Sequence, residues 1–227
     1  MKRVPWVVLS AVALVAPLCW PILTGRIFTG ADLPNFNLPI RYLYSEALRA
    51  GDSMLWTPSL FSGFFIFGDG QGGMAHPFHL VLYRIAPLWL AFGLEILTSY
   101  VAALAGARVL FGRLGFSPPG AWLGAIVFAF SGFNLLHISH MNAVAIVAHV
   151  PWVLAATHAL MTAGESRTRG WAFAAIALLL GSEILLGYPH YVWMTMLATG
   201  ALVIGLIWTG APIARAGLAA LAVGAGV

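Results

Sequence analysis

Charged side chains are scarce in this chain. Asp, Glu, Lys and Arg together make up 8% of its 227 residues, whereas hydrophobic residues make up 61%. A soluble domain carries roughly a quarter charged residues, and a disordered chain has few apolar side chains, so both classes are excluded. The composition indicates an all-α protein, a polytopic bundle of transmembrane helices forming a single membrane domain.

Basic clusters and cysteine pairs are also missing. The ten arginines and one lysine are scattered, so the net charge of +4 indicates no nucleic-acid partner. The only cysteine, Cys19, lies in an apolar run and cannot form a disulfide within the chain. The excess of basic residues is therefore interpreted as an indicator of how the chain is oriented in the membrane.

Long apolar runs locate the spans, because a bilayer-crossing helix needs about 20 apolar residues. The sequence predicts helices at about 4–23, 88–110, 121–138, 143–161, 171–186 and 191–208, with a seventh beginning in 211–227. The first run is long for a signal peptide and no small-x-small cleavage site follows it, so it is interpreted as a retained helix. The last run stops without a closing charge, and we expect the chain to be the N-terminal part of a longer protein.

Basic residues outside the long first loop, 24–87, fall in alternate connections. They are Lys2, Arg3, Arg108, Arg113, Arg167, Arg169 and Arg215. The positive-inside rule then places the N-terminus in the cytoplasm and loop 24–87 outside. Within that loop, residues 38–49 have the spacing of an amphipathic interfacial helix, with Arg41, Glu46 and Arg49 on its polar side. The glycine-rich stretch 51–73 predicts an irregular loop.

Most carboxylates and imidazoles fall on this predicted outer side. Because they come from separate connections that meet at one membrane surface, they indicate a site for the polar headgroup of a lipid carrier. The candidate binding residues are Arg41, Arg49, Asp52, Asp69, His76, His79, His137, His140, Glu183 and His190.

Several landmarks carry a family resemblance. They are Ala31-Asp32-Leu33-Pro34, Gly51-Asp52-Ser53-Met54-Leu55-Trp56, His76-Pro77-Phe78-His79-Leu80, Phe128-Ala129-Phe130-Ser131-Gly132-Phe133-Asn134, Pro151-Trp152 and Leu186-Gly187-Tyr188-Pro189-His190. In this order they resemble the bacterial YfhO-like membrane proteins of the GT-C glycosyltransferase superfamily.

The resemblance implies an enzyme of the bacterial inner membrane that takes a sugar from a polyprenyl-phosphate donor. It also implies a catalytic acid in the first outer loop, which by position is Asp32. Many relatives carry two adjacent acids there, whereas Leu33 follows Asp32 in this chain. No cofactor is therefore required, and a divalent metal stays an open alternative that no paired-acid motif supports.

The residues allow more than one interpretation. Asp32 is a candidate general base for the acceptor hydroxyl, or a helix cap. Arg41, Arg49 and Arg84, with His76 and His79, are candidates to meet the leaving phosphate, or the arginines anchor the loop to lipid headgroups.

Other polar residues also have two interpretations. His137 and His140 line the pocket or, with His190 or Glu183, bind a metal. Glu95 lies within a span and is expected to pair with a neighbouring helix. The competing functions are a transporter or flippase for a lipid-linked precursor and an inactive GT-C-like assembly partner.

Overall fold

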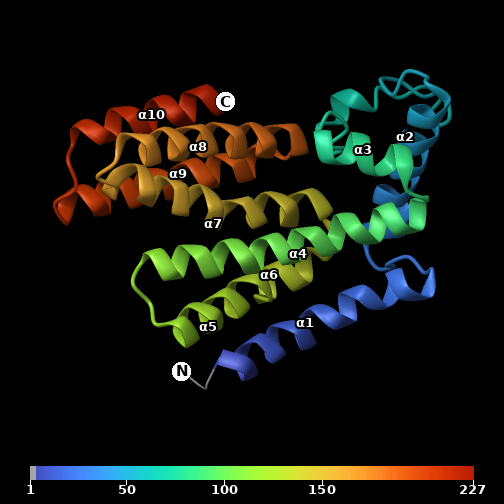
Figure 1. Ribbon diagram of the computed structural model, residues 1–227. Coiled ribbons are helices and arrows are strands. Elements are labelled where there is room, and N and C mark those ends of the chain that lie inside the picture. Colours follow the sequence, from blue (N-terminus) through green and yellow to red (C-terminus); the bar gives the residue numbers. More distant parts are fainter. Residues whose placement is uncertain (1–3) are drawn as a thin grey trace.

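The computed structural model describes the backbone of residues 4–227 and the side chains of residues 9–68 and 70–227. Within these residues every regular element is a helix, and one isolated antiparallel bridge joins Thr57 to Phe64. The predicted all-α class is therefore confirmed. Figure 1 shows the long helices lying side by side as a bundle, with the first loop gathered at one end.

The bundle consists of seven apolar segments. They are α1 (Val4–Thr24), α4 (Leu88–Arg113), α5 (Pro118–Ala129) with the short α6 (Gly132–Leu136), α7 (Met141–Thr162), α8 (Ser166–Leu186), α9 (Pro189–Trp208) and α10 (Ala214–Gly226). Five of them are long and apolar enough to cross a membrane: Leu88–Arg113, Pro118–Ser139, Met141–Thr162, Ser166–Leu186 and Pro189–Trp208. The chain is a membrane protein by this criterion, and the predicted spans agree with these helices to within a few residues.

Helices α4 and α7 form the centre of the bundle. Helix α7 packs against α4 on one side and against α8 and α9 on the other. Gly106 of α4 lets the indole of Trp152 come close, since a Cβ atom there would lie 2.5 Å from Trp152 Nε1. The same indole donates a hydrogen bond to the Ala102 carbonyl over 2.9 Å. Small residues thus allow close helix contact where no aqueous hydrophobic effect acts between helices.

The span predicted over 121–138 is confirmed as Pro118–Ser139, but its helix is interrupted between Ala129 and Gly132. The Asn134 amide donates to the carbonyls of Phe128 and Ala129, at 2.9 and 3.2 Å. The Ser131 hydroxyl accepts from the Asn134 backbone N–H over 3.4 Å. These side chains supply partners for backbone groups at the helix ends, which makes the break tolerable in an apolar environment.

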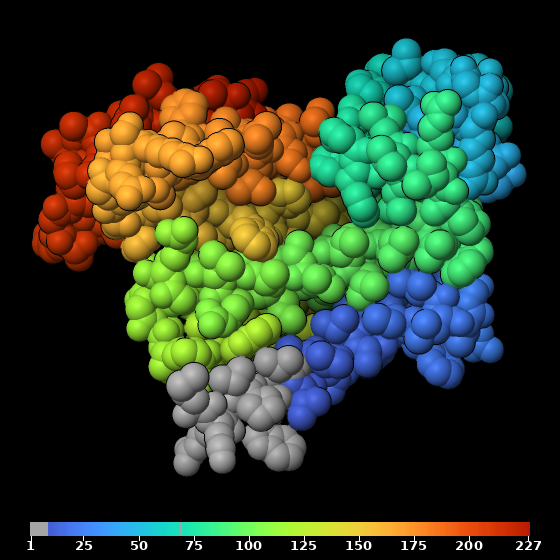
Figure 2. Space-filling view, in the orientation of Figure 1, coloured from blue at the N-terminus to red at the C-terminus, as the bar shows by residue number. Residues whose placement is uncertain are grey.

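Loop 25–87 covers one end of the bundle, which we call the loop end. It contains a π-helical turn (Leu33–Asn37), α2 (Leu38–Ala50), a 3₁₀ turn (Phe67–Asp69) and α3 (Pro77–Ile85). Figure 2 shows the later residues of this loop, cyan to green, as one body beside the end of the orange α8. The predicted helix over 38–49 is confirmed as α2.

Four of the basic residues outside the loop lie at the opposite end of the bundle, and Lys2 and Arg3 lie outside the described residues. Arg113 ends α4, Arg167 and Arg169 lie in the first turn of α8, and Arg215 lies in the first turn of α10. Arg215 donates to the Met161 carbonyl at the end of α7 over 2.7 Å. The structure therefore places these four arginines on one side, as their alternate spacing predicts, and the loop end on the other.

We expect Asn134→Ala to lower the thermal stability of the protein in detergent micelles. Asn134 is 1% exposed, and its loss leaves two carbonyls without their side-chain donor, at a cost of about 1–3 kcal/mol. The control is Asn35→Ala, because Asn35 is exposed on the π-helical turn. Equal unfolding temperatures for the two variants would contradict a stabilising role of Asn134.

Candidate functional site

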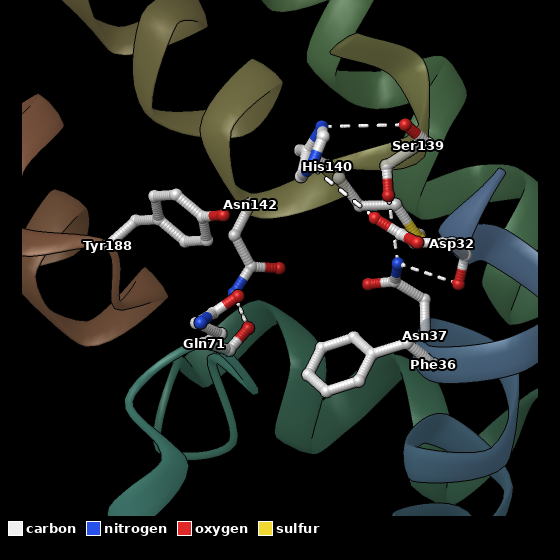
Figure 3. Close-up of a pocket in the computed structure, with 9 residues that line it drawn as sticks. Asp32, Phe36, Asn37, Gln71, Ser139, His140, Asn142 and Tyr188 are labelled. Atoms are coloured by element: carbon white, nitrogen blue, oxygen red, sulfur yellow. Dashed lines mark hydrogen bonds and ion pairs between the residues drawn. The ribbon is translucent and has the colours of Figure 1, made fainter.

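A pocket of about 280 Å³ opens at the loop end of the bundle. Its lining comes from four separate segments of the chain, namely the turn before α2, the glycine-rich loop, the start of α7 and the connection between α8 and α9. Figure 3 shows these side chains facing one another across the pocket. The lining residues are Asp32, Phe36, Asn37, Gln71, Ser139, His140, Met141, Asn142 and Tyr188.

Asp32 and His140 form the acid–imidazole pair of this pocket. Asp32 Oδ2 lies 3.5 Å from His140 Nε2, and the two side chains are 58% and 38% exposed. The Ser139 hydroxyl lies 3.4 Å from His140 Nδ1. If this hydroxyl donates to Nδ1, the neutral ring keeps its proton on Nε2, directed at the carboxylate.

Asp32 does not cap the following helical turn. It stands at the N-cap position of Leu33–Asn37, but its carboxylate makes no capping hydrogen bond. The Asn37 amide instead ties this turn to the start of α7, donating to the carbonyls of Ser139 (2.8 Å) and Asp32 (3.3 Å). The backbone of Asp32 is thereby held at the pocket, and its carboxylate, 58% exposed, lines the pocket beside His140.

Strained backbone lies on both sides of the pocket. Ala31 and Tyr188 adopt left-handed conformations, with φ of 43° and 61°. Such conformations are costly for residues other than glycine and are concentrated at functional sites. Beside Tyr188, a Cβ atom on Gly187 would lie 1.8 Å from the Gly70 carbonyl oxygen. Only glycine allows the glycine-rich loop to approach the α8–α9 connection this closely.

Asn142, in the first turn of α7, joins three walls of the site. Its amide nitrogen donates to the Gln71 carbonyl and, over 2.5 Å, to the Leu186 carbonyl. Its amide oxygen accepts from Arg41 Nη2 over 2.9 Å. One buried side chain thus holds the glycine-rich loop, the end of α8 and helix α2 together.

A buried ion pair lies behind Asn142. Arg41 binds Glu95 of α4 through Nη2 to Oε1 (2.6 Å) and Nε to Oε2 (3.0 Å), and both side chains are 2% exposed. Arg41 Nη1 donates to the Gly72 carbonyl, and the Tyr83 hydroxyl donates to Glu95. Burial disfavours the guanidinium charge, but the Glu95 carboxylate more than offsets it and holds the pKa of Arg41 above its ordinary value. Burial beside Glu95 likewise keeps the pKa of Tyr83 well above its usual range, so this hydroxyl retains its proton.

The expectation that Arg41 lies on the polar side of an interfacial helix is wrong. Arg41 is buried, whereas Glu46 and Arg49 of the same helix are exposed. Arg41 is absent from the pocket lining, and Glu95, Gly72 and Asn142 occupy its guanidinium. Glu95 is expected to pair with a neighbouring helix of the bundle. Its partner is instead Arg41 of the loop, 54 positions away in the sequence.

The structure gathers only Asp32 and His140 of the predicted residues into the pocket. Arg49 is exposed and donates to the Ala86 carbonyl, and Asp52 and Arg84 are exposed. The side chain of Asp69 lies outside the described part of the structure. Arg49, Asp52 and Arg84 therefore contribute nothing to the lining of the described pocket.

The remaining candidates lie around the pocket or deeper in the bundle. His137 stacks on Phe133 with ring centroids 4.0 Å apart, and the exposed ring of His190 packs on Tyr188. Glu183 is fully buried in α8 near Thr195. His76 and His79 line a second cavity, which lies between the start of α3 and helices α4 and α7. Among the described side chains, no group of three or more His, Cys, Asp or Glu could hold a metal ion.

Sequence reasoning missed the amide residues of the site. Asn37, Gln71 and Asn142 line the pocket together with Tyr188. Asn142 carried a signal, because an amide in the first turn of an apolar span requires hydrogen-bond partners. For Gln71 the sequence carries no signal beyond its position in a glycine-rich loop.

Comparison with known proteins adds no relative. No protein-family model, no curated protein and no solved structure matches the chain.

We expect the Arg41–Glu95 pair to be strongly coupled in stability. Arg41→Met or Glu95→Leu alone leaves a buried charge without its partner, at a cost of about 3–5 kcal/mol, whereas the double variant leaves neither charge. The free energy of unfolding, measured by titrating dodecyl sulfate into detergent micelles, should therefore fall less in the double variant than the sum of the single effects. Arg49→Met serves as the exposed control, and additive effects would contradict the coupling.

Proposed function

We propose that the protein is a membrane glycosyltransferase that moves a sugar from a polyprenyl-phosphate donor to a cell-envelope acceptor. The observation that carries this proposal is the Asp32–His140 pair at the rim of the loop-end pocket. A carboxylate held beside an imidazole, accessible from one end of a transmembrane bundle, suits proton removal from an acceptor hydroxyl. The resemblance to GT-C glycosyltransferases, in which Asp32 has the position of the catalytic acid, supports the same assignment.

In the proposed reaction Asp32 is the general base. The acceptor hydroxyl oxygen forms a bond to the anomeric carbon of the sugar, and its proton passes to the Asp32 carboxylate. The bond from the anomeric carbon to the phosphate oxygen breaks, and the electron pair leaves with the lipid phosphate. His140 orients Asp32 through its Nε2, which lies 3.5 Å from the carboxylate.

The opposite side of the pocket suits the polyprenyl-phosphate sugar. Gln71 and Tyr188 lie across the pocket from Asp32 in Figure 3. In the proposal, polar groups on this side meet the charge that develops on the departing phosphate, since such charge is stabilised by preorganised donors. Arg41 has a positioning role, because it holds Asn142 and the glycine-rich loop in place rather than contacting the substrate.

The proposed orientation places this pocket outside the cytoplasm. The four arginines at the other end of the bundle favour a cytoplasmic location for that end under the positive-inside rule. The protein would then lie in the bacterial inner membrane with its N-terminus in the cytoplasm. This side suits an acceptor in the cell envelope.

A protein that binds the lipid carrier without transferring the sugar is the second candidate. The specific observation is the environment of residue 33, where many GT-C relatives carry a second acid. Leu33 is 2% exposed and packs in a cluster with Phe92 and Met141, away from the pocket lining. Among the described side chains, the site therefore has one carboxylate at its rim. The transfer assay below separates the two candidates.

We expect Asp32→Asn to abolish sugar transfer. The assay uses the purified protein in lipid nanodiscs, labelled polyprenyl-phosphate sugars and envelope acceptors. Loss of the base should lower the rate by about 10²–10⁴-fold, and Asp52→Asn, an exposed acid of the same loop, should retain the wild-type rate. Equal rates for Asp32→Asn and wild type would remove Asp32 as the base, and donor binding without transfer by the wild type would favour the second candidate.

Orientation can be tested by cysteine labelling. In a Cys19→Ser background, Ser59→Cys lies in the loop and Ser166→Cys lies at the arginine end, and both positions are exposed. We expect an impermeant thiol reagent to label position 59 in intact spheroplasts and position 166 only after lysis. The reverse pattern would invert the proposed orientation.

A further inference from the structure

Helix α3 exposes an apolar face, although it belongs to the loop. Its other face is buried against the rest of the protein through Leu82 and Tyr83. The outer face carries apolar side chains that are 39%, 59% and 75% exposed, namely Phe78, Val81 and Ile85. A helix whose outer face meets water carries polar side chains there.

The neighbouring helix α2 has such a polar outer face. Its exposed side chains include Glu46 and Arg49, and α2 packs against α3. The loop therefore has a polar outer side at α2 and an apolar outer side at α3. An exposed apolar face of this kind marks a surface that contacts a membrane or another protein.

The start of α3 lies deeper than the end of a neighbouring transmembrane helix. Helix α8 has 21 residues and is about 32 Å long, close to the hydrocarbon thickness of about 30 Å. Ser182 lies about 6 Å inside the loop-side end of α8 at Leu186. His76, the residue before α3, places its Nε2 atom 2.8 Å from the Ser182 hydroxyl oxygen. Helix α3 therefore begins at the depth of the hydrocarbon region.

Helix α3 then returns along α4 to the surface. His79 Nε2 lies 3.4 Å from Glu95 Oε1, and Glu95 is about 10 Å from the first residue of α4. Ala86 and Pro87 alone connect the end of α3 to Leu88, where α4 begins. Figure 1 shows the two helices beside each other at the loop end, and they are in contact. The outer face of α3 thus lies at the depth of the first turns of a membrane-crossing helix.

The chain that leads into α3 is not helical, and its carbonyl groups have donors within the protein. Backbone at membrane depth requires such partners, because lipid chains supply none. Gly72, Gly73 and Met74 are buried. The carbonyls of residues 70–74 accept, in chain order, from the Tyr188 backbone N–H, the Asn142 amide, Arg41 Nη1, His79 Nδ1 and the Tyr44 hydroxyl. Five successive carbonyls are thus provided for without water.

Charged side chains are missing from the same part of the sequence. Residues 70–83 contain no Asp, Glu, Lys or Arg, whereas Asp69 precedes them and Arg84 follows. Arg84 is exposed in the last turn of α3, near the surface, where its long side chain can reach lipid headgroups. The uncharged stretch therefore coincides with the part of the loop that descends beside the transmembrane helices.

We propose that residues 72–85 form a re-entrant membrane segment, whose helix α3 contacts lipid acyl chains through Phe78, Val81 and Ile85. The chain enters the hydrocarbon region against the bundle and returns through α3 before α4 begins. The bilayer is the partner of the outer face, because this face lies at the depth of helices that the bilayer surrounds. The proposal does not depend on glycosyl transfer or on which side of the membrane the loop lies.

The first test measures the surroundings of single spin-labelled cysteines, in a Cys19→Ser background of the full chain in lipid nanodiscs. The variants Phe78→Cys, Val81→Cys and Ile85→Cys probe α3, and Glu46→Cys on α2 is the control. A nitroxide in lipid relaxes mainly through oxygen, and one in water mainly through a water-soluble nickel chelate. We expect oxygen to dominate at the three α3 positions and the nickel chelate to dominate at position 46.

Depth along α3 distinguishes a re-entrant helix from one that lies flat on the membrane. Positions 78 and 85 are about 10 Å apart along the helix, so the label should lie deepest at 78 and shallowest at 85. Equal depth at the two positions would overturn the re-entrant assignment. Dominance of the nickel chelate on α3, or poor access for both probes as under another protein, would overturn lipid as the partner.

A matched pair of substitutions tests the same face without a label. Val81 and Tyr42 are similarly exposed, at 59% and 51%, but lie on the apolar side at α3 and the polar side at α2. Val81→Asp places a carboxylate against acyl chains and should lower the unfolding temperature in nanodiscs by several degrees. Tyr42→Asp should remain close to the wild type. Equal unfolding temperatures for the two variants would show that α3 faces water and contradict the proposal.

Discussion

The buried pair of Arg41 and Glu95 is the interaction on which the loop end depends. It joins a helix of the loop to the first turns of a transmembrane helix, where an unpaired carboxylate is costly. Through Gly72 and Asn142 the same guanidinium fixes the glycine-rich loop, and that loop forms one wall of the pocket. The loop is therefore an integral part of the fold, and the pocket wall formed by the glycine-rich loop is held by the arginine of this pair.

Helix α7 borders both the Asp32 pocket and a smaller cavity of about 180 Å³. Its first turn presents Asn142 to the Asp32 pocket, while Ala145, Ala148 and His149, further along the helix, line the smaller cavity. One helix thus contributes to a polar pocket near its start and to a mainly apolar cavity one to two turns later.

The fold followed from the sequence where a local pattern decides the structure. Apolar runs fixed the spans, because length and hydropathy suffice for insertion into a bilayer. The break after Ala129 was missed, since it depends on side-chain bonds of Asn134 that no periodicity shows. In the candidate site, Asp32 and His140 lie together, and the sequence had assigned both residues to the same side of the membrane. The burial of Arg41 did not, because helical spacing separates polar from apolar faces but cannot reveal a charged partner on another helix.

Asn142 has a consequence for the order in which the protein assembles. Its three hydrogen bonds join it to residues 41, 71 and 186, which leave the ribosome at widely different times. Arg41 and Glu95 can pair as soon as α4 is inserted, but the glycine-rich loop gains its Asn142 bond only with α7, and the Leu186 bond waits for α8. Because domains generally fold from the N-terminus during synthesis, the loop stays incompletely docked until residue 186 has been made. The pocket is thus completed only after α8.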